Sequence, residues 1–116
     1  MTLTTENTLY TVTGITDAHR DSAIDFLQGA VYCWCKNRPD EWFALRDLMG
    51  GDNTLWAGTP LMPIYNKHNH LSDDEAFTAA AKDAGWLLKH AIVNDSRIFD
   101  TEKNGIVRQY KWNKKV

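Results

Sequence analysis

Apolar side chains recur at helical spacing in the first third of the chain. The apolar positions that share one helical face are Ile24, Leu27, Val31 and Trp34. Thr16 or Asp17 suits the N-cap of such a helix, and Pro39 blocks its continuation. The pattern therefore predicts an amphipathic helix over residues 17–37.

A second helical pattern covers residues 72–93. It begins at a capping box, in which Ser72 is followed three residues later by Glu75. The positions expected to be buried are Phe77, Ala81, Ala84, Leu88 and Ala91. Small alanines among them favour the close approach of another helix. Gly85, inside this helix, indicates either such close packing or a break.

The hydrophobic period then changes from helix to strand. Residues 97–112 form a hairpin pattern whose turn signal is Asn104 followed by Gly105. A two-residue turn there would place Lys103 opposite Ile106 and Phe99 opposite Tyr110. The aromatic residues expected on one face, near the base of the hairpin, are Phe99, Tyr110 and Trp112.

The middle of the chain is less regular. Trp42 and Phe43 indicate a short extended segment, and a short helix follows it, which Gly50 and Gly51 end. Trp56 lies in a loop and is expected to return to the core. A further helix is expected over residues 60–68. The fold class is therefore α+β: a small, mainly helical domain over residues 16–116, preceded by an extended and partly flexible segment at residues 1–15.

Composition narrows the class of protein. A chain of 116 residues is expected to form one domain, and no run of about 18 apolar residues indicates a membrane span. The polar N-terminus lacks the basic and apolar parts of a secretory signal. Cys33 and Cys35 are two residues apart in a helix, so they point to different sides and are expected to stay reduced. These features predict a cytoplasmic protein.

Charge is divided unevenly between the two parts of the chain. Residues 82–116 carry eight basic and four acidic side chains, whereas residues 1–81 carry five basic and eleven acidic ones. The net charge of −2 therefore conceals a basic C-terminal third. Such an asymmetry indicates contact with nucleic acid.

A helix followed by a two-stranded ribbon resembles the C-terminal half of winged-helix domains. The resemblance covers roughly residues 42–112. It rests on the order of the elements, the Asn104-Gly105 wing and the aromatic base of the ribbon. It implies that residues 60–71 and the helix at 72–93 form a helix-turn-helix, with the hairpin as the wing. The sequence departs from this pattern at Pro63, which lies inside the first of these helices.

The expected function is a small, non-enzymatic nucleic-acid-binding module. Thr78, Lys82, Trp86 and Lys89 share one side of the helix at 72–93, and His90 lies at its edge. Lys and Trp side chains facing outward suit a phosphate backbone and base stacking. The complete set of expected nucleic-acid-binding residues is Lys82, Trp86, Lys89, His90, Lys103, Arg108 and Lys111. The partner expected from this set is duplex DNA.

Other functions remain open on the sequence. A protein-interaction domain without nucleic-acid binding would use Trp56 and Trp86 as anchors. The helix at 17–37 either packs across the domain or pairs with a second copy. No cofactor or metal is expected, because the chain has no phosphate-binding glycine motif and because His68 and His70 lack a second ligand cluster nearby in the sequence. Catalysis by either cysteine is not expected, since no strand-to-helix elbow displays its thiol.

Overall fold

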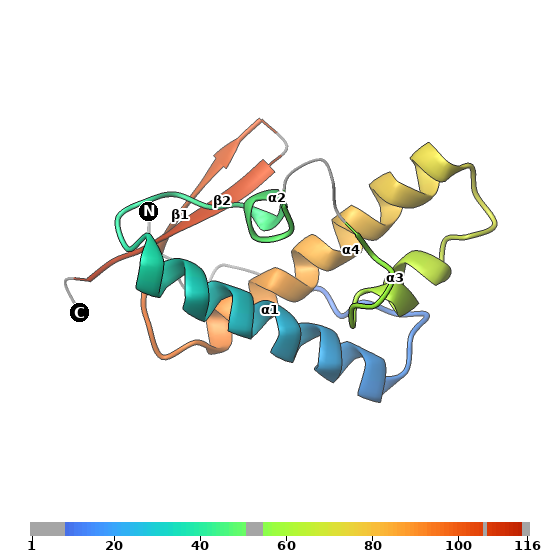
Figure 1. Cartoon of the computed structure of the whole chain (residues 1–116), viewed down its shortest axis with the longest axis horizontal. Helices are drawn as coiled ribbons and strands as arrows, with labels where there is room; N and C mark the ends of the chain where they lie inside the picture. Colours follow the sequence, from blue (N-terminus) through green and yellow to red (C-terminus); the bar gives the residue numbers. More distant parts are fainter. Residues whose placement is uncertain (1–8, 51–54, 106, 115–116) are drawn as a thin grey trace.

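The computed structural model describes residues 9–50, 55–105 and 107–114. In these residues, helices are followed by a two-stranded antiparallel hairpin, so the chain is a small α+β domain, as expected (Figure 1). The helices are α1 Asp17–Asn37, α2 Leu45–Leu48, α3 Met62–Asn66 and α4 Asp73–Asn94, and the strands are β1 Phe99–Asn104 and β2 Val107–Trp112.

Helix α1 begins and ends where its capping residues predict. The hydroxyl of Thr16 accepts a hydrogen bond from the backbone N–H of His19 at 3.0 Å. The fully buried positions follow one side of the helix: Ala23, Leu27, Val31 and Cys35. Ile24 and Trp34, expected on the buried face, are half-buried. The buried stripe is therefore turned slightly from its expected position.

Ser72 is the N-cap of helix α4, as expected, and its hydroxyl accepts from the backbone N–H of Glu75 at 3.3 Å. The carboxylate of Glu75 accepts from the Ser72 hydroxyl at 2.7 Å, so the N-cap half of the expected capping box is present. Its buried positions are Ala76, Ala80, Ala84, Leu87, Leu88, Ala91 and Ile92. The prediction that Phe77 lies in the core is wrong, because 39% of its surface is exposed. Ala81 is half-buried. Ala84, Leu88 and Ala91 are buried as expected, whereas in the first two turns Ala76 and Ala80 are buried in place of Phe77 and Ala81.

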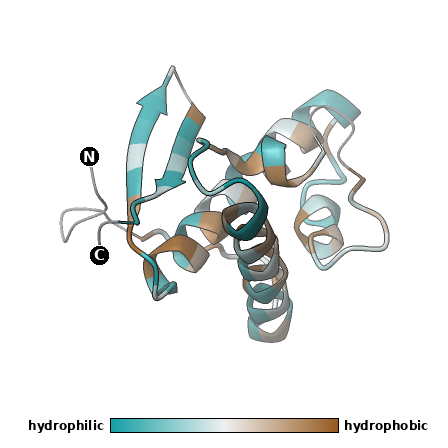
Figure 2. Cartoon of the chain, turned by 60° about the vertical axis from the view of Figure 1, so that its left-hand side comes forward, coloured by the Kyte–Doolittle hydropathy of each residue, from teal (hydrophilic) through white to brown (hydrophobic). Residues whose placement is uncertain are grey.

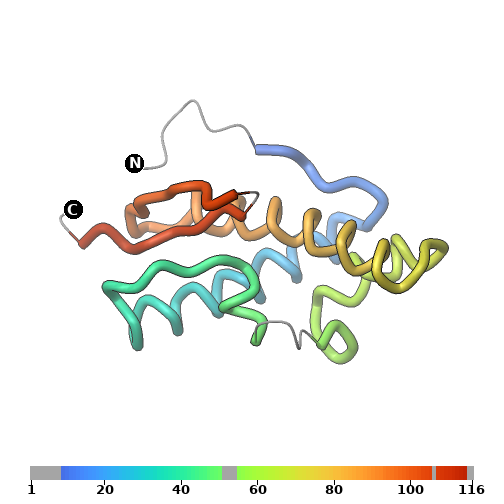
Figure 3. Tube along the Cα trace, turned by 90° about the horizontal axis from the view of Figure 1, so that it is seen from above, coloured from blue at the N-terminus to red at the C-terminus, as the bar shows by residue number. Residues whose placement is uncertain are grey.

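Helices α1 and α4 pack against each other and cross at an angle, and both run from one end of the domain toward the base of the hairpin (Figures 1 and 3). The buried side chains at their contact are mostly small or aliphatic, which allows the two helices to approach closely. The apolar side of α1 is therefore used within the domain, which is the first of the two alternatives for this helix. Its outward side carries polar residues that include Asp21 and Asp25.

The hairpin forms with a register different from the expected one. Phe99 pairs with Trp112, Thr101 with Tyr110, and Lys103 with Arg108. Asn104 belongs to β1 and pairs with Val107, so the turn lies one residue later than expected, and Gly105 takes the positive φ of 67°. Glycine at the first position of a two-residue loop is typical of a type II′ turn, the alternative to the expected type I′ turn. The pairing shifts by two residues, so each side chain keeps its face.

Phe43 joins the hairpin to the helices. Its backbone N–H and carbonyl both bond to the backbone of Tyr110 at 2.8 Å, which adds a single bridge beside β2. Its ring lies 5.6 Å from that of Trp34, 6.2 Å from that of Phe99 and 6.0 Å from that of Tyr110. The hairpin is otherwise largely hydrophilic along its length (Figure 2). These few aromatic contacts therefore fix the position of the hairpin. Burial among these rings raises the pKa of Tyr110 to about 12.

The helix before α4 is shorter than the sequence predicts. Helix α3 covers residues 62–66, shorter than the expected 60–68, and turns continue from it to Leu71. Trp56 does return to the core, with 8% of its surface exposed and its ring 5.6 Å from that of Tyr65. Gly51 and residues 52–54, expected to end α2 and begin the loop, lie outside the described residues, as do residues 1–8 of the expected N-terminal segment and the tail from Lys115.

Replacement of Phe43 by alanine tests the aromatic attachment of the hairpin. We expect Phe43→Ala to lower the free energy of unfolding by about 3–5 kcal/mol, since it leaves a cavity among three rings. Phe77→Ala removes the same side chain from a partly exposed site and should cost about 1 kcal/mol. Urea denaturation of both variants makes the comparison. Equal losses would contradict the central position of Phe43.

Two glycines should respond to alanine in opposite directions. Helix α4 continues through Gly85, and a Cβ there would meet no atom within 4 Å, so neither close packing nor a break explains this residue. We expect Gly85→Ala to raise the free energy of unfolding by about 0.5–1 kcal/mol through helix propensity. Gly105→Ala should lower it by about 1–2 kcal/mol, because alanine is strained at positive φ. Thermal unfolding measures both signs.

Candidate nucleic-acid interface

Helix α4 is covered along most of its length. Between residues 79 and 92, Lys82 is the one exposed side chain, and the other positions are buried or half-buried. Thr78, one turn earlier, is also exposed. The side of α4 that was expected to face a nucleic acid is therefore open only in its first half.

The second half of that side is covered by the N-terminal segment. The ring of Tyr10 lies 5.5 Å from the ring of Trp86, and the Nε2 of His90 lies 3.1 Å from the carbonyl oxygen of Tyr10. Trp86 is consequently half-buried and is not an outward-facing stacking residue. The ammonium group of Lys89 lies over the same indole, 5.2 Å from its centroid.

Two contacts hold the N-terminal segment in this place. Val12 is fully buried in the core. The Nε and Nη2 atoms of Arg20 donate to the carbonyl oxygen of Val12 at 3.0 and 2.8 Å. Local patterns could not show this, because the contact between residue 10 and residue 86 depends on the path of the folded chain. Residues 9–13, part of the segment expected to be extended, form no strand.

The structure brings three of the expected cations together near the tip of the hairpin. Lys103 and Arg108 are register partners and therefore share one face of the hairpin. Arg108 donates from Nη1 to the hydroxyl of Thr101 at 3.3 Å. Burial, and after it the nearby charge of Arg108, lower the pKa of Lys89. Lys89 of α4 thus lies within electrostatic reach of the hairpin.

Lys82 extends this group along α4. It precedes Lys89 by seven residues, which is about 10 Å along a helix. We refer to the four residues Lys82, Lys89, Lys103 and Arg108 as the tip cations. They come from α4 and from the hairpin, which follows α4 directly in the chain.

Lys111 does not belong to this group. Alternate residues of a strand point to opposite faces, so Lys111 faces away from the side of the hairpin that carries Arg108. Its ammonium group lies 5.1 Å from the ring centroid of Trp42. The expected site therefore divides into the tip cations, the covered pair Trp86 and His90, and a separate Lys111.

The sequence analysis missed cations that come from the end of α1 and the start of the hairpin. Arg38 lies 5.1 Å from the ring centroid of Trp34, and Arg97 lies 5.6 Å from that of Tyr32. The signal that could have revealed the first of these is the alternation of aromatic and basic residues over positions 32–38.

No group of three His, Cys, Asp or Glu side chains in the described residues is arranged to hold a metal ion. His68, considered as a ligand together with His70, instead places its Nε2 2.8 Å from a carboxylate oxygen of Asp83. The ammonium group of Lys67 lies 2.8 Å from the same oxygen. This cluster attaches the end of α3 to α4, so His68 has a structural role in the fold.

The two anchors of a protein-interaction surface are also occupied. Trp56 is buried, and its ring lies 5.9 Å from that of Phe77, edge to face. Trp86 is covered by Tyr10. The apolar side chains that remain exposed in this neighbourhood are Leu55, at 70%, and Phe77, at 39%. Neither anchor is presented to a partner in the folded chain.

Comparison of the chain with protein-family models, with curated proteins and with solved structures finds no match to any of them. The function must therefore be argued from the side chains themselves. Within the described residues, no helix has the length and apolarity needed to cross a membrane.

The two cysteines should differ in reactivity. Burial raises the pKa of the Cys35 thiol. The charge of Arg97 lowers this pKa and the charge of Asp95 raises it, and both effects are smaller than that of burial. Cys33, by contrast, is exposed. We expect iodoacetamide at pH 8 to modify Cys33 at least about ten times faster than Cys35, because alkylation requires an accessible thiolate. Peptide mass spectrometry measures both rates. Cys33→Ser should remove the fast reaction and Cys35→Ser should leave it, while urea should make the rates similar.

Proposed function

We propose that the protein is a small non-enzymatic module that binds duplex nucleic acid through the tip cations. In this proposal the fold is of the winged-helix type, with α3 and α4 as the helix-turn-helix and β1–β2 as the wing. Its support is the coarse architecture: a helical domain that ends in an antiparallel hairpin. The two free thiols suit the cytoplasmic location expected from the sequence.

The observation that carries the proposal is the pairing of Lys103 with Arg108 on one face of the hairpin. Burial is the larger cause of the lowered pKa of Lys89, and the charge of Arg108 adds to it, so Lys89 of α4 lies within electrostatic reach of this pair. Like charges held near each other repel, so an anion placed between them relieves an unfavourable interaction. Phosphate groups spaced along a backbone are anions suited to such an arrangement.

The mode of binding differs from the one the sequence indicated. Because Tyr10 covers Trp86, α4 does not offer a stacking residue to the groove. The contacts left are charge–phosphate contacts from Lys82 on α4 and from the hairpin. Contacts to the phosphate backbone position a protein on DNA without reading its sequence. The proposed module accordingly binds duplexes with weak sequence preference.

A salt titration tests this function. Neutralisation of about four phosphates predicts a slope near −3.6 for log K against log salt, so duplex affinity should fall about a hundredfold between about 50 and 200 mM salt. Fluorescence anisotropy with a labelled duplex gives the slope. Lys103→Gln should reduce its magnitude by about one unit, because it removes one phosphate contact.

Ser22→Glu provides a control with a matched change of net charge. Ser22 is exposed on α1, whose outward side is acidic. The substitution lowers the net charge by one, as Lys103→Gln does, yet it should leave the slope unchanged. Absence of duplex binding at about 50 mM salt, or an equal effect of the two substitutions, rejects the proposal.

A further inference from the structure

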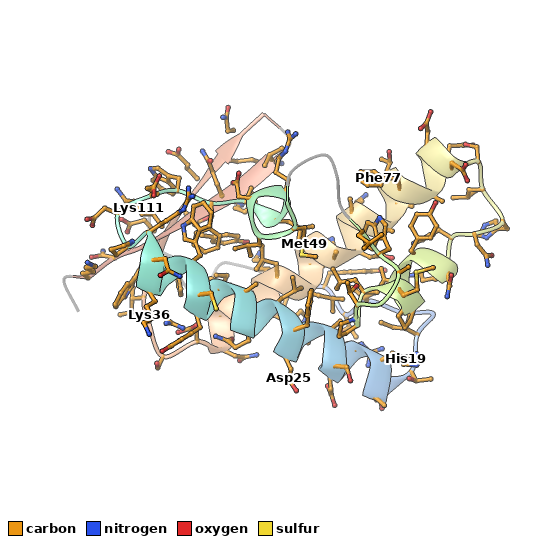
Figure 4. The ribbon with its side chains drawn as sticks, in the orientation of Figure 1. His19, Asp25, Lys36, Met49, Phe77 and Lys111 are labelled. Carbon is orange, nitrogen blue, oxygen red and sulfur yellow. The ribbon has the colours of Figure 1, made fainter. Side chains whose placement is uncertain are left out.

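One end of the domain gathers aromatic rings under positive charges. The last turns of α1, the connection through residues 38–43 and the base of the hairpin meet there (Figure 1), and Lys36 and Lys111 both lie at this end in Figure 4. The four rings are Tyr32, Trp34, Trp42 and Trp112. We refer to these rings, with the cations beside them, as the basic–aromatic end.

Each ring at this end has a cation over or beside it. Lys111 lies 5.1 Å from the centroid of Trp42, and Lys114 lies 5.4 Å from that of Trp112. Arg97 lies 5.6 Å from Tyr32 and 5.8 Å from Trp112. Together with Arg38 over Trp34, these make five of the six cation–π contacts described in the chain. Four cations, Arg38, Arg97, Lys111 and Lys114, therefore lie against the four rings of this one end.

The cations at this end are not all neutralised by carboxylates. Arg97 is paired with the buried Asp95 at 2.9 Å, and Arg38 lies 4.0 Å from Glu41. The lysines that form no ion pair with any described residue are Lys36, Lys111 and Lys114. Other carboxylates at this end are those of Asp40, Asp47 and Asp100. Asp47 lines a pocket with Trp34 and Arg38, and Asp100 accepts a hydrogen bond from the side chain of Asn113 at 3.2 Å.

Opposing charges are concentrated elsewhere. Both long helices end toward the basic–aromatic end, so their partly negative C-termini offset some of this charge. Both begin at the other end of the domain, where the exposed acidic residues are Asp17, Asp21, Asp25, Asp73, Asp74 and Glu75. In Figure 4, Asp25 lies about midway along the domain, between His19 and Lys36. A polyanion is therefore disfavoured at the end where both helices begin.

We propose that the basic–aromatic end binds single-stranded nucleic acid. Proteins that bind single strands combine cations that follow the phosphates with rings on which bases stack. Tyr32 is 52% exposed. Trp42 and Trp112 are half-buried, but unlike Trp86 they make no ring–ring contact with another described residue. A duplex does not fit this surface as well, because its base faces are already stacked on one another.

The cation–π contacts supply a binding mechanism. In the free protein, Lys111 and Lys114 rest against indole rings. A base that stacks on a ring replaces the ammonium group, which then moves to the neighbouring phosphate. Stacking of a base on an aromatic ring is stronger than an exposed cation–π contact, and the displaced lysine gains a charged partner. The surface differs from the tip cations in both position and ligand.

The test uses the full chain and a labelled oligothymidylate of about 16 nucleotides, which is the upper site size of a small single-strand-binding fold. Anisotropy measures affinity at low salt, and quenching of tryptophan emission reports stacking. The double substitution Lys111→Glu with Lys114→Glu should weaken binding by about tenfold or more. Trp42→Ala should weaken it about tenfold and reduce the quenching, whereas Trp42→Phe, which keeps a ring, should retain most of both.

Lys82→Glu is the matched control, because it reverses a charge on α4 outside the basic–aromatic end. It should weaken duplex binding and leave oligothymidylate binding within about twofold. Unchanged affinity in the Lys111→Glu, Lys114→Glu variant, with the circular-dichroism spectrum intact, overturns the inference, as does a wild-type protein that does not bind the oligonucleotide. Duplex and single-strand titrations fail separately, so loss of one function leaves the other standing.

Discussion

The structure depends on the packing of helix α1 against helix α4, both of which begin at the same end of the domain. Ala80 and Ala84 on α4 lack bulky side chains, so the helices can approach closely, and Leu27 and Val31 of α1 fill the contact. Hydrophobic burial at this contact fixes the relative orientation of the two longest elements. The other parts of the fold attach to this pair of helices. Helix α3 attaches to α4 through Asp83, and the hairpin attaches to α1 through Phe43. The N-terminal segment contacts α4 through Tyr10 and α1 through Val12.

The common direction of α1 and α4 has an electrostatic consequence. Acidic residues stabilise helix N-termini and basic residues stabilise C-termini, so each helix alone favours a separation of charge along its axis. Two helices pointing the same way add these separations, whereas antiparallel helices would cancel them. Lys36, from the mainly acidic first part of the chain, therefore lies at the same end as Lys111 (Figure 4). The net charge of −2 hides this polarity.

Some features of the fold could be predicted from local sequence, and others could not. The starts of α1 and α4 were predictable from Thr16 and Ser72, because a cap acts within three residues. The hairpin was predictable from alternation, yet its register was not, since Gly105 can occupy either of two turn types and the aromatic base decides between them. The cover over Trp86 depends on a contact across 76 residues, between Tyr10 and Trp86, which no local pattern contains.

The covered state of α4 also changes where recognition can occur. A helix that reads a groove needs a continuous exposed side, and α4 has Lys82 alone exposed between residues 79 and 92. Uncovering more of it would break the stacking of Tyr10 on Trp86 and strain a segment that Val12 and Arg20 hold in place. Surfaces that require no such rearrangement bind without this cost. Both proposed surfaces bind without such a rearrangement. Because most of α4 is buried, the accessible cations lie on its flanks and at one end of the domain.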